Sequence, residues 1–324
     1  GIIKGIKEHG LNRIVVASCS PRMHLETFRR TVKSAGLNPY LLEMVNLREQ
    51  CSWIHDNKEQ ATLKAINIVR GGVERARFLE PLEHMNLKVN RDVLVVGGGV
   101  AGIIAATELA DKGYKVHLVE KTPSIGGHMA QLSKTFPTLD CSSCILTPKM
   151  VYAAQNPNIS LLSLSEIRSV EGSPGNYKVS IVKHPRFVDE GKCTACGECA
   201  NKCPMRVPSE FESGLATRKA IYIPFKQAVP NIYAIDERNC LYLTKGICRV
   251  CERFCKGNAI DFGQKDETLE FNVGSIIVAT GFEQIDPSSL KEYGFGLHPD
   301  IVTNLQFERL MLQGIHKPSD GKMP

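Results

Sequence analysis

Residues 92–102 read Asp-Val-Leu-Val-Val-Gly-Gly-Gly-Val-Ala-Gly, a run of β-branched and leucine side chains that ends directly in glycines. This pattern predicts a buried strand over 92–96, a tight turn and a helix that ends at Gly113. Residues 115–119 then predict a second strand, which ends at Glu120. A strand, a G-x-G-x-x-G turn, a helix and an acidic residue about 20 positions further on are typical of a dinucleotide-binding βαβ unit.

Each glycine of this turn has its own physical role. Gly97 allows the tight turn, Gly99 lets the backbone approach the pyrophosphate, and Gly102 allows the helix to pack closely on the strand. The helix N-terminus offers unpaired N–H groups to the phosphates, and Glu120 would accept hydrogen bonds from the ribose. A glycine-rich turn without a ligand is the alternative interpretation. The expected nucleotide contacts here are Gly97, Gly99, Val100, Ala101, Gly102, Glu120 and Lys121.

Two further stretches indicate which dinucleotide binds. Glu120 is followed by a second glycine pair, Gly126-Gly127, and residues 275–281 read Ser-Ile-Ile-Val-Ala-Thr-Gly. Both features resemble the flavoprotein disulfide reductase superfamily, in which an E-x5-G-G stretch and a strand ending in Ala-Thr-Gly flank bound FAD. A plain buried strand and turn is the alternative interpretation of residues 275–281. The resemblance favours FAD over NAD, and it adds to the expected contacts Gly126, Gly127, Ala279, Thr280 and Gly281.

Eight of the twelve cysteines fall in two runs. The first run has the pattern C-x2-C-x2-C-x3-C-P, and the second ends in C-x2-C-x3-C. Three closely spaced cysteines reach one [4Fe–4S] cluster, while the fourth cysteine of each run binds the neighbouring cluster. A pair of zinc ribbons is the alternative, because these also use C-x2-C pairs. The predicted ligands are Cys193, Cys196, Cys199 and Cys255 for one cluster, and Cys203, Cys240, Cys248 and Cys251 for the other.

The cysteine runs lie inside the predicted nucleotide-binding domain, between its early and late strands. An insert anchored at both ends would hold its clusters at a fixed position relative to the flavin. Within it, residues 219–224 and 231–235 predict a hairpin with a proline-bearing turn. We expect an α/β chain with a Rossmann-like FAD domain, an inserted α+β ferredoxin-like domain and a small N-terminal α/β domain. The expected boundaries are 1–88 for the N-terminal domain, 89–183 and 263–324 for the two parts of the FAD domain, and 184–262 for the insert.

The N-terminal domain carries two more cysteines. Strands are predicted over 13–18 and 40–47, each followed by a helix, over 21–35 and 57–79. Cys19 and Cys51 each follow a predicted strand directly. Both should therefore lie at the carboxyl edge of a parallel sheet, where α/β folds bind their ligands.

Composition limits the remaining possibilities. The chain has 324 residues, 43% of them hydrophobic and 23% charged, with a net charge of +6, which is ordinary for a globular protein of two or three domains. It has no apolar run of about 18 residues, no secretory signal and no basic stripe, so we expect no membrane insertion, no nucleic-acid partner and a reducing compartment. The start at Gly1 without methionine suggests a part of a longer chain.

Four cysteines remain outside the two runs: Cys19, Cys51, Cys141 and Cys144. Four thiols are what one further cubane cluster requires, and this is the interpretation we favour. In one alternative, Cys19 with His24 and Cys51 with His55 form a zinc site, while the other two form a redox-active C-x-x-C pair. Buried inert cysteines are the third possibility.

Three long motifs resemble the A subunit of heterodisulfide reductase, the flavin-containing subunit of methanogens and related anaerobes. They are Ala-Ser-Cys-Ser-Pro-Arg-Met-His at 17–24, Arg-Glu-Gln-Cys-Ser-Trp-Ile-His at 48–55, and Phe-Pro-Thr-Leu-Asp-Cys-Ser-Ser-Cys-Ile-Leu-Thr-Pro-Lys-Met at 136–150. The resemblance covers essentially the whole chain. It implies a thioredoxin-reductase-like FAD domain, and it strengthens the assignment of a third cluster.

The resemblance also implies a function. In this family, FAD takes two electrons from a donor and bifurcates them, one toward the CoM-S-S-CoB heterodisulfide and one toward ferredoxin. It implies cytoplasmic dimers of hetero-oligomers that contain B- and C-type subunits and a hydrogenase or formate dehydrogenase module. Two alternatives stay open: a related flavoprotein that feeds a membrane quinone module, and a subunit that only relays electrons.

The sequence departs from the family pattern at two points. Seven residues separate Cys240 from Cys248 where two are usual, and Lys256 replaces the proline after Cys255. Arg249, Arg253 and Lys256 would either raise the potential of nearby clusters or form an ordinary solvated face. We nominate no catalytic acid or base, and we expect His117 and His128 to be packing or surface residues.

Overall fold

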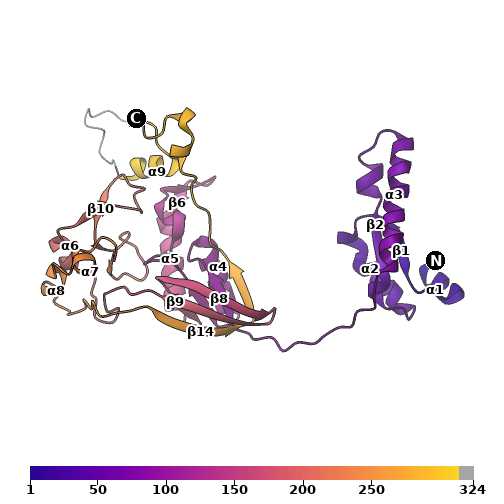
Figure 1. Cartoon of the computed structure of the whole chain (residues 1–324), viewed down its shortest axis with the longest axis horizontal. Coiled ribbons are helices and arrows are strands. Elements are labelled where there is room, and N and C mark those ends of the chain that lie inside the picture. Colours follow the sequence, from indigo (N-terminus) through magenta and orange to yellow (C-terminus); the bar gives the residue numbers. More distant parts are fainter. Residues whose placement is uncertain (314–324) are drawn as a thin grey trace. The chain divides into compact units, whose positions relative to one another are not determined.

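The computed structural model describes residues 1–313 and divides the chain into two compact units, residues 1–86 and a second unit that begins at Leu87 (Figure 1). The last part of the predicted FAD domain, residues 314–324, lies outside the described residues. The predicted domain boundaries stay predictions.

The first unit is the small β-α-β-α unit that the sequence predicts. Strands β1 and β2 pair in parallel, with Ser18 opposite Asn46. Helix α2 begins where predicted, because Pro21 occupies its first turn and the Ser20 side chain accepts a hydrogen bond from the Arg22 N–H. The elements are α1 (Ile2–His9), β1 (Ile14–Ser18), α2 (Pro21–Ser34), a 3-10 turn (Pro39–Leu41), β2 (Leu42–Asn46), a π-helical turn (Arg48–Ser52) and α3 (Lys58–Arg77).

The prediction that Cys51 follows its strand directly is wrong. Strand β2 ends at Asn46, and Cys51 lies in the π-helical turn that comes next. The strand stops because the Asn46 side chain accepts a hydrogen bond from the Glu49 N–H and turns the chain. Cys19, by contrast, does follow β1 directly, so both cysteines still lie beyond the carboxyl ends of the two paired strands.

The second unit is built on a four-stranded parallel sheet with the order β15-β3-β4-β7. On one face, Val95 and Leu118 pack against helices α4 and α5, for example against Ile103 and Leu146. Its elements up to the cysteine runs are β3 (Val93–Val96), α4 (Val100–Asp111), β4 (Val116–Val119), a 3-10 turn (Gly127–Gln131), β5 (Lys134–Thr135), β6 (Asp140–Cys141), α5 (Ser142–Gln155), β7 (Ile159–Leu162), β8 (Ser165–Ser173) and β9 (Asn176–Lys183).

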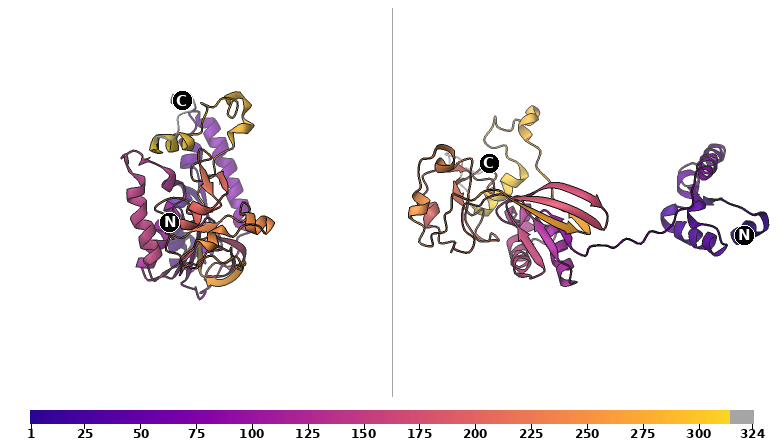
Figure 2. Two further views of the ribbon diagram at one scale, coloured as in Figure 1. Left: turned by 90° about the vertical axis from the view of Figure 1, so that its left-hand side faces the viewer. Right: turned by 60° about the horizontal axis from the view of Figure 1, so that its bottom comes forward.

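An antiparallel sheet with the order β14-β9-β8 covers the other face of the parallel sheet (Figures 1 and 2). Leu94 and Val119 of the parallel sheet pack there against Val179, Ile181 and Val273. The unit therefore has three layers: helices, parallel sheet and antiparallel sheet. The sequence pattern predicts the parallel strands β3, β4 and β15 but not this antiparallel layer.

The two ends of the cysteine-rich segment are connected to adjacent strands of the antiparallel sheet, β9 and β14. Lys183, the last residue of β9, pairs with Glu267, the first residue of β14. The predicted hairpin is present as the antiparallel pair β12–β13, but each strand has only two residues. The elements from here on are α6 (Glu198–Lys202), β10 (Arg206–Pro208), β11 (Thr217–Lys219), β12 (Ile221–Tyr222), β13 (Ala234–Ile235), α7 (Leu241–Lys245), α8 (Val250–Arg253), β14 (Glu267–Val273), β15 (Ser275–Val278), 3-10 turns (Pro287–Ser289, Lys291–Tyr293) and α9 (Asn304–Gln313).

Arg186 ties this segment to the parallel-sheet part of the unit. Its guanidinium donates hydrogen bonds to the Pro123 carbonyl at 2.9 Å, to the Ser163 hydroxyl at 2.7 Å and to the Ile232 carbonyl at 3.2 Å. It also pairs with Glu190 at 3.3 Å, although the Arg186 side chain is only 4% exposed. Burial lowers the pKa of the guanidinium. One side chain thus joins the loop after β4, the end of β7 and the loop before β13.

We predict that Arg186→Met lowers the free energy of unfolding by about 2–4 kcal/mol, because it leaves buried carbonyl and hydroxyl groups without their donor. Denaturant unfolding of the anaerobically purified chain measures this. Arg168→Met, on the exposed face of β8, is the matched control and should change stability by less than about 0.5 kcal/mol. Equal stability of the two variants would contradict the role given to Arg186.

Candidate cofactor sites

The glycine turn after β3 contains two positions that only glycine can occupy. Gly97 has φ +104°, and a Cβ there would lie 2.3 Å from the Ala279 carbonyl oxygen. A Cβ on Gly102 would lie 1.8 Å from the Gly97 carbonyl oxygen. Both contacts are with backbone atoms that cannot move aside cheaply, so these two glycines are required by the fold itself.

Gly99 differs from its neighbours. A Cβ there would meet no atom of residues 1–313 within 4 Å, and its φ of −75° is open to any residue. Nothing in the described part of the chain therefore requires glycine at this position, which lies at the N-terminus of α4. The open space is where the backbone of a dinucleotide-binding turn approaches the pyrophosphate.

The second glycine pair packs directly on the first. The Gly126 N–H donates to the Gly98 carbonyl at 2.7 Å, and a Cβ on Gly127 would lie 3.0 Å from the Gly99 Cα. Gly126 and Gly127 both have positive φ values, of +129° and +57°. The two glycine-rich stretches together form one cradle with little side-chain bulk.

Glu120 is held rigidly at the end of β4. Its carboxylate accepts hydrogen bonds from the Gly98 N–H at 2.7 Å and from the Thr122 N–H and hydroxyl at 2.8 Å each. The side chain is buried, so it is positioned before any ligand binds. Lys121 instead points to solvent and pairs with the exposed Glu283 at 3.2 Å.

The Ala279-Thr280-Gly281 turn lies beside the first glycine turn. The Ala279 N–H donates to the Val96 carbonyl at 2.8 Å, and Gly281 has φ +74°. The structure thus brings the three expected nucleotide-binding stretches to one edge of the parallel sheet, at the carboxyl ends of β3, β4 and β15. Their geometry fits the pyrophosphate and ribose of a dinucleotide.

The two histidines of this region have packing contacts. The His128 ring stacks on Phe282 with centroids 4.7 Å apart, and its Nδ1 lies 2.7 Å from Gln131 Oε1. His117 in β4 packs on Phe271 at 4.0 Å, and burial lowers the pKa of its imidazole.

The eight cysteines of the two runs line two cavities. Each cavity has a volume of about 350 Å³ when the space open to solvent is included. These are the same two groups of four that the spacing predicts. The first cavity is lined by Cys193, Cys196, Cys199 and Cys255. The second is lined by Cys203, Cys240, Cys248 and Cys251.

Both departures from the family pattern are accommodated. The extra residues between Cys240 and Cys248 form helix α7, which ends at Gly246 with φ +71°. Cys248 itself adopts φ +79°, which is unusual for a residue with a side chain, and it still lines the second cavity. Cys255 lines the first cavity although Lys256 follows it. Helices α6, α7 and α8 gather at the end of the unit opposite the turn between β8 and β9 (Figures 1 and 2).

Burial changes the chemistry of these thiols. It raises the pKa of Cys199 and of Cys251 to about 12 each. At neutral pH the thiols of Cys199 and Cys251 are therefore protonated when no metal is bound, and metal binding must displace their protons. In the described chain, no group of three or more His, Cys, Asp or Glu side chains is arranged to hold one metal ion. The cysteines surround a space, which suits a cluster with an iron at each corner.

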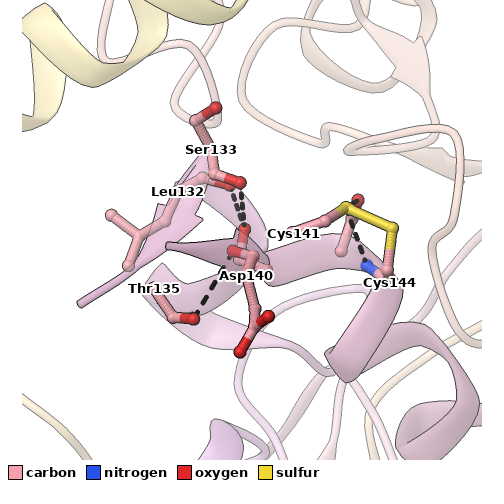
Figure 3. The surroundings of a disulfide bond; sticks show 8 residues. Leu132, Ser133, Thr135, Asp140, Cys141 and Cys144 are labelled. Atoms are coloured by element: carbon pink, nitrogen blue, oxygen red, sulfur yellow. Dashed lines mark hydrogen bonds between the residues drawn. A yellow bond between two sulfur atoms is a disulfide. The ribbon is translucent and has the colours of Figure 1, made fainter. Parts of the chain in front are cut away.

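Cys141 and Cys144 are joined by a disulfide in this structure (Figure 3). Cys141 pairs with Lys134 in the β5–β6 hairpin and caps α5, where its sulfur accepts a hydrogen bond from the Cys144 N–H at 3.3 Å. A disulfide cannot bind iron as thiolates do, so cluster binding by this pair requires its reduction. The disulfide joins the same two cysteines that form the redox-active C-x-x-C pair in the alternative interpretation of the sequence.

The other two cysteines lie in the first unit. Cys51 is buried and Cys19 is partly exposed. His55 Nδ1 lies 3.0 Å from the Cys51 carbonyl oxygen, so this ring contacts backbone. The assignment of Cys19, Cys51, Cys141 and Cys144 to one cluster stays a prediction.

None of the helices within residues 1–313 has both the length and the apolar character needed to cross a membrane.

Comparison with known proteins identifies two segments. Residues 92–143 match the FAD dependent oxidoreductase family, and residues 186–209 match the 4Fe-4S binding domain. These matches cover the glycine cradle and the first cysteine run. They define the chain as part of an oxidoreductase with an FAD-binding α/β fold and iron–sulfur clusters.

The relatives identify the family. The chain is 50% identical, over its whole length, to the iron-sulfur A subunit of CoB–CoM heterodisulfide reductase from Methanocaldococcus jannaschii, of which it covers 50%. It is 50% identical to the A subunit of H2:CoB-CoM heterodisulfide,ferredoxin reductase from Methanothermobacter thermautotrophicus, covering 49% of that protein. The A subunit of H2/formate:CoB-CoM heterodisulfide,ferredoxin reductase from Methanococcus maripaludis is 48% identical, with 50% covered. The chain thus spans about half the length of these relatives, and it belongs to the family of heterodisulfide reductase A subunits.

Proposed function

We propose that this chain is the part of a heterodisulfide reductase A subunit in which FAD passes single electrons to [4Fe–4S] clusters during flavin-based electron bifurcation. The observation that carries the proposal is the pair of cavities with four cysteines each, in a segment whose two ends join adjacent strands of the nucleotide-binding unit. When bound, FAD and the clusters supply the change from two-electron to one-electron chemistry.

The residues of the chain would act in binding and positioning. The glycines at 97–102 and 126–127 would admit the pyrophosphate, Glu120 would orient the ribose, and Ala279 to Gly281 would line the same edge. The first cavity would hold one cluster and the second cavity another, with the cysteines as thiolate ligands. Arg186 would keep the cluster segment at a constant position relative to the nucleotide cradle.

The partners and substrates are also part of the proposal. The names of the relatives refer to the CoB–CoM heterodisulfide, to ferredoxin, and to hydrogen or formate. We propose the same heterodisulfide and ferredoxin as acceptors here, in cytoplasmic complexes with B- and C-type subunits and a hydrogenase or formate dehydrogenase module. The inserted-domain architecture and its boundaries at 184 and 262 belong to this proposal too.

Coupling between the two acceptors tests the proposed activity. The complex is purified anaerobically from its source, and reduction of the CoM-S-S-CoB heterodisulfide is followed with and without oxidised ferredoxin. Bifurcation requires that heterodisulfide reduction stops when ferredoxin is omitted. Undiminished reduction without ferredoxin would favour the relay alternative. Co-purification with a membrane-bound haem subunit would favour the quinone alternative.

The third cluster can be tested separately. We predict that Cys141→Ser lowers the iron content by about four per chain and leaves the two cavity clusters in place, because a serine hydroxyl is a poor ligand for iron. Iron analysis of the anaerobically purified variant measures this, with Ser143→Ala as the control of unchanged iron content. Iron content equal to that of the wild type would show that Cys141 is not a ligand and would favour the dithiol alternative.

A further inference from the structure

Lys219 makes a direct contact with one of the proposed cluster ligands. Its ammonium group donates a hydrogen bond to the Cys203 carbonyl oxygen at 2.6 Å. Lys219 is the last residue of β11 and pairs with Arg206 of β10, which follows Cys203 closely in the sequence. The next two residues, Ala220 and Ile221, line the second cavity. The strand pairing and the hydrogen bond therefore fix a positive charge beside this cavity.

Unlike the charge of the adjacent Arg218, the charge of Lys219 is paired with no carboxylate among the described residues 1–313. Arg218 is held by Glu210 at 2.5 Å and by Asp236 at 2.8 Å. Lys219 takes part in no ion pair with any residue among 1–313. It is also half-buried, so solvent screens its field less than that of an exposed lysine.

Other basic side chains near the two cavities are less suited to act on a cluster, because a carboxylate pairs with them or solvent screens them. Lys192 beside the first cavity pairs with Asp189 at 3.2 Å, and Arg249 beside the second pairs with Glu252 at 2.6 Å. Lys202 lies over the Phe254 ring at 5.1 Å and is exposed to solvent. Among these charges, Lys219 is the half-buried one. Its ammonium group is hydrogen-bonded to a proposed ligand residue, and no carboxylate of the described chain pairs with it.

We infer that Lys219 raises the reduction potential of the cluster held by Cys203, Cys240, Cys248 and Cys251. The inference rests on the proposed function, since it presumes a cluster in the second cavity. Reduction adds one electron to the cluster, and a fixed positive charge nearby stabilises the reduced form. The hydrogen bond to the carbonyl of Cys203 holds that charge in place. An electron that can move between the two clusters would then reside on the cluster of the second cavity more often than it would without this charge.

Redox titration of the anaerobically purified protein, followed by electron paramagnetic resonance, tests this. Lys219→Gln should lower the potential of one cluster by an amount equal to about a tenfold change in its reduction equilibrium, or about 59 mV. The potential of the other cluster should change much less. Lys226→Gln, at an exposed position on the same segment, is the matched control and should leave both potentials unchanged.

Lys219→Arg keeps the positive charge and covers the case in which the glutamine variant loses its cluster. Its cluster potentials should stay close to those of the wild type, and a tenfold shift in Lys219→Arg would overturn the inference. So would a Lys219→Gln protein with both clusters present and both potentials unchanged. Either result would leave the proposed function intact, because wild-type protein without cluster signals is what would contradict that function.

Discussion

Gly99→Ala is expected to weaken FAD binding by about tenfold to a hundredfold while the fold stays intact. A Cβ at this position meets no atom of the described residues within 4 Å, and the backbone conformation suits alanine. The methyl group would instead occupy the space through which the pyrophosphate approaches, and overfilling such a space costs about 1–3 kcal/mol. Flavin content and FAD affinity of the anaerobically purified variant measure the effect.

Gly102→Ala is the matched variant, and it should destabilise the fold itself, whereas Gly99→Ala should weaken only FAD binding. Its Cβ would lie 1.8 Å from the Gly97 carbonyl oxygen, so α4 must move away from β3. We expect the free energy of unfolding to fall by more than about 3 kcal/mol, with loss of FAD as a consequence. If Gly99→Ala bound FAD as tightly as the wild type, the space at Gly99 would not be the pyrophosphate site.

Double cysteine-to-serine variants should show which ligands belong to which cavity, and we expect them to change the iron content strongly. Cys251 and Cys255 are only four residues apart, yet they line different cavities. The Cys251→Ser/Cys255→Ser double variant should therefore lose both clusters, or about eight irons per chain. The Cys203→Ser/Cys251→Ser double variant should lose only about four, because both cysteines line the second cavity.

The measurement is iron content per chain after anaerobic purification, with each single variant as a control that loses about four irons. The comparison does not depend on the total number of clusters in the chain, since only the differences are used. A loss of about eight irons from Cys203→Ser/Cys251→Ser would mean that the ligands are shared in another way.

The sequence predicted the features that depend on residues close together in the chain. The strand, glycine turn and helix from Val93 to Asp111 could be predicted because β-branched runs and glycines have strong local preferences. The spacing within each run predicts which three cysteines belong together, while the assignment of the fourth cysteine to the other run depends on the two-cluster pattern. Helix α2 was predicted correctly because Pro21 and Gly36 mark its two ends.

The features that the sequence did not predict depend on distant residues. Strand β9 pairs with β14 across the whole cysteine-rich segment, and no local signal connects Lys183 with Glu267. The contacts of Arg186 with Pro123 and Ser163 arise only when the folded chain brings three loops together. The same holds for Lys219, since a lysine in a short edge strand gives no sign that its ammonium group reaches Cys203.

The quantity of iron, zinc and FAD in the anaerobically purified chain tests the proposed cofactor content most directly. We expect one FAD, no zinc and about twelve irons per chain, of which about eight belong to the two cysteine-lined cavities. Stoichiometric zinc in place of iron, or a chain that carries neither iron nor flavin when purified without oxygen, would contradict it.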